Sequence, residues 1–240
     1  DGGTQELMIV CNGLLHTSTY LSTYPWTWTA RAGALSTTGT PSFMQFRDAT
    51  SDVVYIADGG LLNVWNGTTL TTNIVGTLDV TTLAVHNQRL WGCGNSAFPD
   101  SIFYSALNNG DTLANGAAGG GQIIVRTFSD ETVVGLASIN TSLLIFHRRG
   151  ISRLTGYGQD DITVAPQGLT ADVGTIAPRS ITSIGNLGFF VSERGLYKCN
   201  ESEVIPVGTV ETPDPLLPVI RNLTSAQIAT ISATFNRATR

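Results

Sequence analysis

Short apolar runs separated by polar, glycine-containing turns recur along the whole chain. Residues 7–11 form the first run, Asn12-Gly13 follows, and residues 14–16 form a second run. Asn-Gly between apolar runs is the strongest short hairpin signal, because both central residues of a type I′ turn need positive φ. The pattern therefore predicts antiparallel β-hairpins.

The same unit of apolar strands and glycine turns returns at intervals typical of a repeat protein. Further copies begin near residues 53, 83, 133 and 181. Their irregular spacing averages the length of one propeller blade, about 40 to 50 residues. We therefore predict an all-β chain folded as a β-propeller of about five or six blades, the radial arrangement that protects sheet edges. The alternative is an ordinary β-sandwich built of hairpins.

The repeat alignment makes predictions for single residues. Gly59, Gly60, Gly150 and Gly195 lie in turns between apolar strands, and at least two of these four are expected at positive φ. Four large aromatic residues in the strands are expected to be buried between blades: Trp65, Trp91, Phe146 and Phe190.

Between and after the copies the pattern is irregular. Residues 17–41 and 108–121 are rich in turn formers and are expected to be long loops at the strand ends. We assign residues 1–210 to the blades and residues 211–240 to a proline-rich linker, a short helix over 224–229 and the start of a closing strand over 232–240. The chain looks truncated at both ends.

Composition narrows the classes of function. Charged residues make up 13% of the chain and the net charge is −5. A strongly basic nucleic-acid-binding domain is thereby excluded, because affinity for duplex DNA depends largely on neutralisation of phosphates by Lys and Arg. Twelve of the thirteen cationic residues are arginines, which favours contacts between proteins. No apolar stretch is long enough to predict a membrane span.

No motif predicts a catalytic, cofactor-binding or metal site, and we expect no enzyme activity and no cofactor. Cys11, Cys93 and Cys199 are far apart and are interpreted as free structural thiols. The histidines, at positions 16, 86 and 147, have no second ligand at metal spacing. An enzymatic alternative, a propeller hydrolase, would need carboxylates that converge in a central pocket, and the available ones are Asp52, Asp58, Asp100, Asp130 and Glu131.

One aromatic group is a candidate contact for a glycan or a protein partner. Trp26 and Trp28 lie in the first predicted loop, flanked by Tyr24, and Trp rings stack on sugars and on partner surfaces. A carbohydrate- or receptor-binding propeller is therefore the alternative function. An array of glycans probed with both tryptophans changed to Ala separates the two functions.

The middle and later copies resemble a known family. The matching stretches are residues 87–92 with 100–105, residues 144–156, and residues 174–181 with 189–197. Across residues 83–205 they resemble bacteriophage virion proteins with a β-propeller fold that form the hub or nozzle of short tails, including packaged-DNA stabilisation proteins. The resemblance is one of blade pattern and carries no diagnostic functional residue.

The resemblance implies a structural virion protein that forms a ring and continues the DNA ejection channel. Its expected partners are copies of itself, other tail or portal and adaptor proteins, and DNA that passes without sequence-specific binding. Its expected location is the virion tail, with the host cytoplasm as the place of assembly. A polar lining of Thr, Ser and Asn with few cations would suit passage of DNA better than binding.

Overall fold

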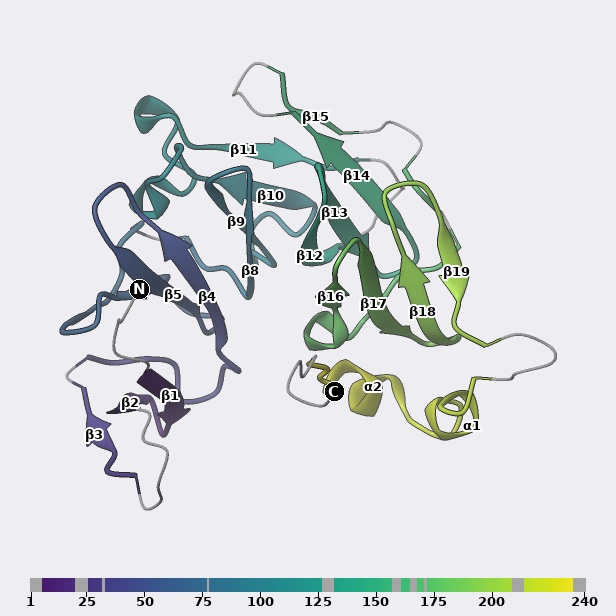
Figure 1. Ribbon diagram of the computed structural model, residues 1–240, viewed down its shortest axis with the longest axis horizontal. Coiled ribbons are helices and arrows are strands. Elements are labelled where there is room, and N and C mark those ends of the chain that lie inside the picture. Colours follow the sequence, from purple (N-terminus) through teal and green to yellow (C-terminus); the bar gives the residue numbers. More distant parts are fainter. Residues whose placement is uncertain are drawn as a thin grey trace.

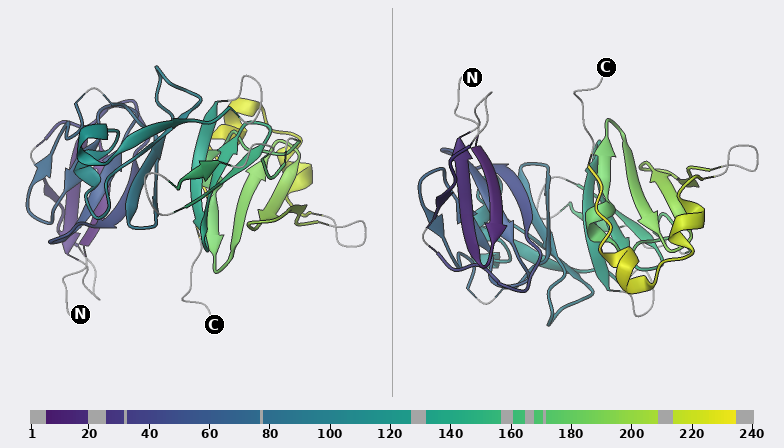
Figure 2. Two further views of the ribbon diagram at one scale, coloured as in Figure 1. Left: turned by 90° about the horizontal axis from the view of Figure 1, so that it is seen from above. Right: turned by 90° about the horizontal axis from the view of Figure 1, so that it is seen from below.

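The computed structural model describes residues 6–19, 26–31, 33–76, 78–126, 132–156, 161–164, 168–170, 172–208 and 214–234. Within these residues the chain forms five antiparallel sheets, each built from strands that follow one another in sequence. The sheets stand side by side in an arc around a central region, as Figure 1 shows. Figure 2 shows the same sheets from above and from below the view of Figure 1.

Sheet 1 has three strands and sheets 2 to 5 have four each. Sheet 1 contains β1 (Glu6–Cys11), β2 (Leu14–Thr19) and β3 (Thr29–Ala30), and sheet 2 contains β4 (Ser42–Arg47), β5 (Asp52–Ala57), β6 (Asn63–Trp65) and β7 (Leu70–Thr71). Sheet 3 contains β8 (Thr82–His86), β9 (Arg89–Cys93), β10 (Ser101–Tyr104) and β11 (Gly121–Ile124). Sheet 4 contains β12 (Val133–Ile139), β13 (Ser142–His147), β14 (Ile151–Thr155) and β15 (Thr163–Val164), and sheet 5 contains β16 (Thr182–Ile184), β17 (Leu187–Ser192), β18 (Gly195–Cys199) and β19 (Val204–Pro206).

Left-handed turn residues join the first and second strands of sheets 1, 3, 4 and 5 into hairpins. Asn12 and Gly13 have φ of 49° and 74° and join β1 to β2, which pair over six residue pairs. Among the four turn glycines, Gly59 and Gly195 have φ of 80° and 128°, and the other two are not in the positive-φ region. The prediction of at least two positive values is confirmed.

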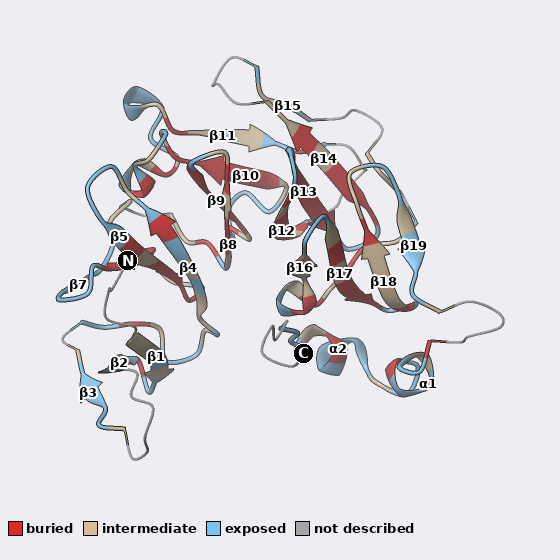
Figure 3. Ribbon diagram, in the orientation of Figure 1, coloured by how far each residue is buried: buried red, intermediate tan, exposed pale blue. Residues whose placement is uncertain are grey.

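Apolar clusters fill the space between consecutive sheets. Trp65 joins sheet 1 to sheet 2, and Trp91 lies between sheets 3 and 4. Phe146 and Phe190 pack edge to face at 5.2 Å between sheets 4 and 5. All four aromatic side chains are at most 2% exposed, which confirms their predicted burial. Figure 3 shows the buried residues concentrated in strands of sheets 2 to 5.

Two short helices, α1 (Leu217–Ile220) and α2 (Ser225–Ala229), follow the last sheet. Ile220 and Ile228 are buried against Val191 of sheet 5. The helices therefore cover the face of sheet 5 that is turned away from sheet 4. Thr224 caps α2 in a capping box with Gln227, which confirms the helix predicted there. The helix α1 was not predicted, because the prolines of this segment were expected to break regular structure. Proline is compatible with the first turn of a helix, and Pro218 takes that position.

Three expectations about the irregular segments need correction. The second sheet begins at Ser42 with β4, eleven residues before the expected start at 53. Residues 17–41 are not one loop, because they include the end of β2 and the whole of β3, and residues 108–121 include 3₁₀ turns at Gly110–Thr112 and Gly116–Ala118. Residues 232–234 are not in a strand, and residues 235–240 lie outside the described part of the chain.

Candidate functional site

A cavity of about 780 Å³ lies at the centre of the arc. The inner strands are the first strands of sheets 2 to 5, namely β4, β8, β12 and β16, and all four line the cavity. The C-terminal segment completes the wall with Ala229, Ser232 and Ala233. A volume of this size is in the range of small-molecule sites, so the cavity is the first candidate site to consider.

The cavity wall is made of hydroxyls and apolar groups. Its hydroxyls come from eight residues: Thr40, Ser42, Thr81, Thr82, Ser138, Thr182, Ser183 and Ser232. Arg179 supplies the one charged side chain of this lining, and no carboxylate or imidazole belongs to it. Catalysis by acid and base needs titratable groups at the reacting atoms, and the described lining offers none beyond an arginine.

The carboxylates considered for a hydrolase do not meet in this cavity, so far as the structure describes them. Asp52 pairs with Arg47 at 3.0 Å on the surface of sheet 2. Asp58 accepts a hydrogen bond from the backbone N–H of Ser36 at 2.6 Å, and a second from the N–H of Gly60 at 2.9 Å that stabilises the β5–β6 turn. Asp100 lies 3.8 Å from Arg126. Residues 130 and 131 are outside the described residues.

Two histidines are buried within the sheets. His86 is 2% exposed at the end of β8, and its Nδ1 lies 2.8 Å from the Ser138 hydroxyl of the next sheet. Nε2 of His147 lies 3.0 Å from the Ser152 hydroxyl within sheet 4. Burial lowers the pKa of His86, and the more distant Glu201 carboxylate only partly opposes this shift. His86 is therefore held neutral at the contact between sheets 3 and 4.

The lowered pKa of His86 predicts a loss of stability in mild acid. As pH falls through the ordinary histidine value of 6.5, the unfolded chain takes up a proton that the folded chain resists, so the unfolded state gains. We expect the melting temperature to fall between pH 7.5 and pH 5.5, and the fall to be smaller in His86→Gln. Thermal melts at both pH values check this, with His16→Gln as the control, and an unchanged fall in His86→Gln would contradict it.

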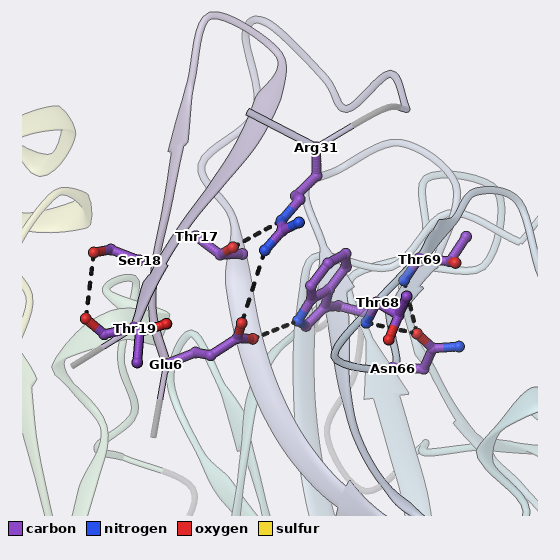
Figure 4. Close-up of polar contacts among 9 residues, drawn as sticks. Glu6, Thr17, Ser18, Thr19, Arg31, Asn66, Thr68 and Thr69 are labelled. Carbon is purple, nitrogen blue, oxygen red and sulfur yellow. Dashed lines mark hydrogen bonds and ion pairs between the residues drawn. The ribbon is translucent and has the colours of Figure 1, made fainter. Parts of the chain in front are cut away.

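A polar cluster joins sheet 1 to sheet 2, as Figure 4 shows. The indole N–H of Trp65 donates to Glu6 at 3.0 Å, and the guanidinium of Arg31 lies 4.9 Å from the Trp65 ring centre. Arg31 also donates to the Thr17 hydroxyl at 2.8 Å and lies 3.9 Å from the Glu6 carboxylate. The two charged groups of the cluster, the Glu6 carboxylate and the Arg31 guanidinium, both have partners within the protein. The cluster therefore links sheet 1 to sheet 2 and leaves neither charge unpaired for a substrate.

A second polar cluster ties sheet 2 to the segment after β10. The hydroxyl of Tyr55 donates to Asp111 at 2.8 Å, and Asp48 accepts from the backbone N–H of Gly110 at 3.2 Å. Burial raises the pKa of Asp48, with the Asp111 charge adding to the effect. Burial also raises the pKa of Tyr55, so its hydroxyl stays a hydrogen-bond donor. Among the described residues no group of three or more His, Cys, Asp or Glu side chains is placed to hold a metal ion.

The aromatic candidate contact is only partly described. Trp28 is 38% exposed just before β3, and Trp26 is half-buried beside it. Tyr24 lies outside the described residues, so the three rings are not placed together. Exposure of Trp28 leaves this surface accessible to a partner, and its role stays a prediction.

The three cysteines differ in accessibility. Cys11 is exposed on β1, whereas Cys93 and Cys199 are buried and free. Burial raises the pKa of the Cys93 and Cys199 thiols to about 12. We expect an aromatic disulfide reagent at pH 8 to titrate one thiol per folded chain and three after denaturation, because the thiolate is the reactive form. Rapid reaction of two or three thiols in the folded chain would contradict the burial of both.

Five consecutive meander sheets around a central cavity define the class of this chain as an all-β, β-propeller fold. No protein-family model matches the chain, and no curated protein matches it. No helix in the described residues has the length and apolar character of a transmembrane span.

Several solved structures resemble this chain at low identity. One is the CNH domain of AfRom2, with a TM-score of 0.49 and 7% identity over 84% of this chain and 66% of that one. Another is YCF48 bound to D1 peptide, with a TM-score of 0.45 and 11% identity over 85% and 60% of the two chains. A third is PorZ, a surface component of the type-IX secretion system of Porphyromonas gingivalis, with a TM-score of 0.45 and 16% identity over 87% and 27%. This chain therefore spans less than two thirds of each of these structures.

Proposed function

We propose that this chain is a non-enzymatic structural subunit of a short phage tail, where copies form a ring of the hub or nozzle that continues the DNA ejection channel. The observation that supports the proposal is the chemistry of the central cavity. Where a catalytic propeller would gather titratable side chains, the described wall has hydroxyls, apolar groups and one arginine. A structural subunit needs no such convergence.

The placement of the segments that resemble tail proteins is compatible with this function. Residues 87–92 and 100–105 belong to sheet 3 and residues 144–156 largely to sheet 4, while residues 174–181 precede sheet 5 and residues 189–197 lie in its β17 and β18. The stretches contribute Trp91, Phe146 and Phe190 to the packing between sheets 3, 4 and 5, and a ring component needs such packing to be rigid. Partners in the proposal are further copies of the chain and neighbouring tail, portal or adaptor proteins.

Assembly state tests the proposal directly. We expect native mass spectrometry of the full-length protein, alone and in purified phage particles, to find it as a defined ring or as a fixed number of copies per particle. A protein that is strictly monomeric and absent from every particle would overturn the ring and the tail assignment together. The fold would be unaffected by that result.

Exposure of Trp28 supports a second candidate, a propeller that binds a carbohydrate or receptor. A glycan array with the wild-type chain and with the Trp26→Ala, Trp28→Ala double variant tests it. A glycan signal that the double variant loses would favour the binding module, because a purely structural subunit has no signal to lose. Trp65 is buried and serves no such contact.

A further inference from the structure

The central cavity and the chain as a whole differ in the sign of their charge. The chain has 18 acidic and 13 basic residues and a net charge of −5. In the described lining of the cavity Arg179 is the one charged residue, and neither Asp nor Glu belongs to it. A guanidinium that faces no carboxylate attracts an anion from solution. The cavity is therefore a local exception to the acidic character of the protein.

The fold does not use the guanidinium of Arg179. Within the described part of the chain this group has no hydrogen bond and no ion pair, and the residue is exposed. Four other arginines, by contrast, each form an ion pair with an Asp or Glu side chain. The N–H donors of the Arg179 guanidinium are therefore available to a ligand in the cavity.

Hydrogen bonds hold the backbone of Arg179 in place at the cavity wall. The residue lies in the 3₁₀ turn Pro178–Ser180, directly before β16. The Ser180 hydroxyl accepts from the backbone N–H of Val191 in β17 at 3.0 Å. The carbonyl of Arg179 accepts from the backbone N–H of Ala233 in the C-terminal segment at 2.9 Å. Because the turn is tied on both sides, little backbone ordering is needed when a ligand binds.

Hydroxyl groups of the wall are also available to a ligand. Three of the eight bond within the protein, those of Thr81, Thr82 and Ser138. The other five have no hydrogen-bond partner among the described residues, and they belong to Thr40, Ser42, Thr182, Ser183 and Ser232. A hydroxyl both donates and accepts hydrogen bonds, so these groups match the hydroxyls of a ligand.

The apolar part of the wall is aliphatic. Met44, Val85 and Ile181 line the cavity as half-buried side chains, and no aromatic residue belongs to the described lining. Flat rings are normally bound by stacking on aromatic side chains, which this wall does not offer. An aliphatic carbon chain packs on such a wall through its C–H groups. The cavity volume of about 780 Å³ is ample for a ligand of this kind.

We propose that the central cavity binds a small polyhydroxylated carboxylate, of the open-chain sugar-acid type. Arg179 binds the carboxylate through two parallel N–H donors, the geometry that a guanidinium and a carboxylate share. The Ser and Thr hydroxyls of the wall bind the ligand's hydroxyls. A phosphate monoester carries about two negative charges and is less well matched by one arginine. The binding involves a single chain and does not depend on the proposed ring.

Titration calorimetry of the full chain with probes of equal carbon number tests the ligand class. Gluconate has a carboxylate and hydroxyls, sorbitol has hydroxyls alone, and hexanoate has a carboxylate alone. At constant ionic strength we expect one gluconate to bind per chain, and sorbitol and hexanoate to bind about tenfold or more weakly. Inorganic phosphate is the probe for simple anion binding. No gluconate binding, or equal affinity for gluconate and any of the other three probes, would overturn the proposal.

Two arginine variants place the binding in the cavity. Arg179→Gln should weaken gluconate binding about tenfold or more, because it removes a charge-assisted hydrogen bond. Arg194→Gln is the matched control, since Arg194 is also exposed but does not line the cavity, and it should leave the affinity unchanged. Both substitutions are at exposed positions, so we expect unchanged urea midpoints. Equal affinities of the two variants for gluconate would place the binding elsewhere and overturn the proposal.

Discussion

Replacing Phe146 with alanine is expected to lower the free energy of unfolding by about 3–5 kcal/mol, the usual cost of truncating a fully buried aromatic residue. The side chain is fully buried between sheets 4 and 5 and packs edge to face against Phe190. Truncation removes apolar contacts from both sheets and leaves a cavity that their paired strands cannot close. Urea unfolding followed by circular dichroism gives the change directly, since the midpoint shifts while the slope stays constant.

The matched control is Phe98→Ala, because the Phe98 ring is 50% exposed. We expect this variant to lie within about 0.5 kcal/mol of the wild type, as surface substitutions usually do. Equal losses in the two variants would show that the cluster between sheets 4 and 5 does not stabilise the fold. The comparison therefore tests the arrangement of the sheets as well as the burial of one ring.

The repeat could be predicted from sequence because its signals are local. Asn12-Gly13 and the glycine turns specify hairpins through backbone conformation alone, and alternating apolar residues mark strands with a buried face. The inner strand β4 escaped prediction because the polar residues Ser42, Gln45 and Arg47 interrupt its apolar residues.

Contacts between sheets could not be predicted, because they join residues far apart in the chain. The bond from Trp65 to Glu6 spans 59 residues, and that from Tyr55 to Asp111 spans 56. Neither pair has a local pattern. The burial of Trp65 was predictable from its strand, but its polar partner depends on how two sheets stack. The central cavity likewise combines four inner strands and the C-terminal segment, which no single stretch of sequence indicates.

Gly174 provides the second large expected effect, through backbone packing between sheets 4 and 5. A Cβ added there would lie far inside van der Waals contact with the His147 carbonyl oxygen and close to the backbone at Gly150. That carbonyl also accepts a hydrogen bond from the N–H of Thr175 at 3.0 Å, so neither segment can move without breaking it. We expect Gly174→Ala to lower the free energy of unfolding by about 2–3 kcal/mol, in the range for overpacked interiors.

Gly116→Ala, where an added Cβ meets nothing within 4 Å, is the control and should leave the urea midpoint nearly unchanged. A Gly174→Ala midpoint equal to that of the control would show that the β13–β14 turn does not pack against the entry to sheet 5 as closely as described.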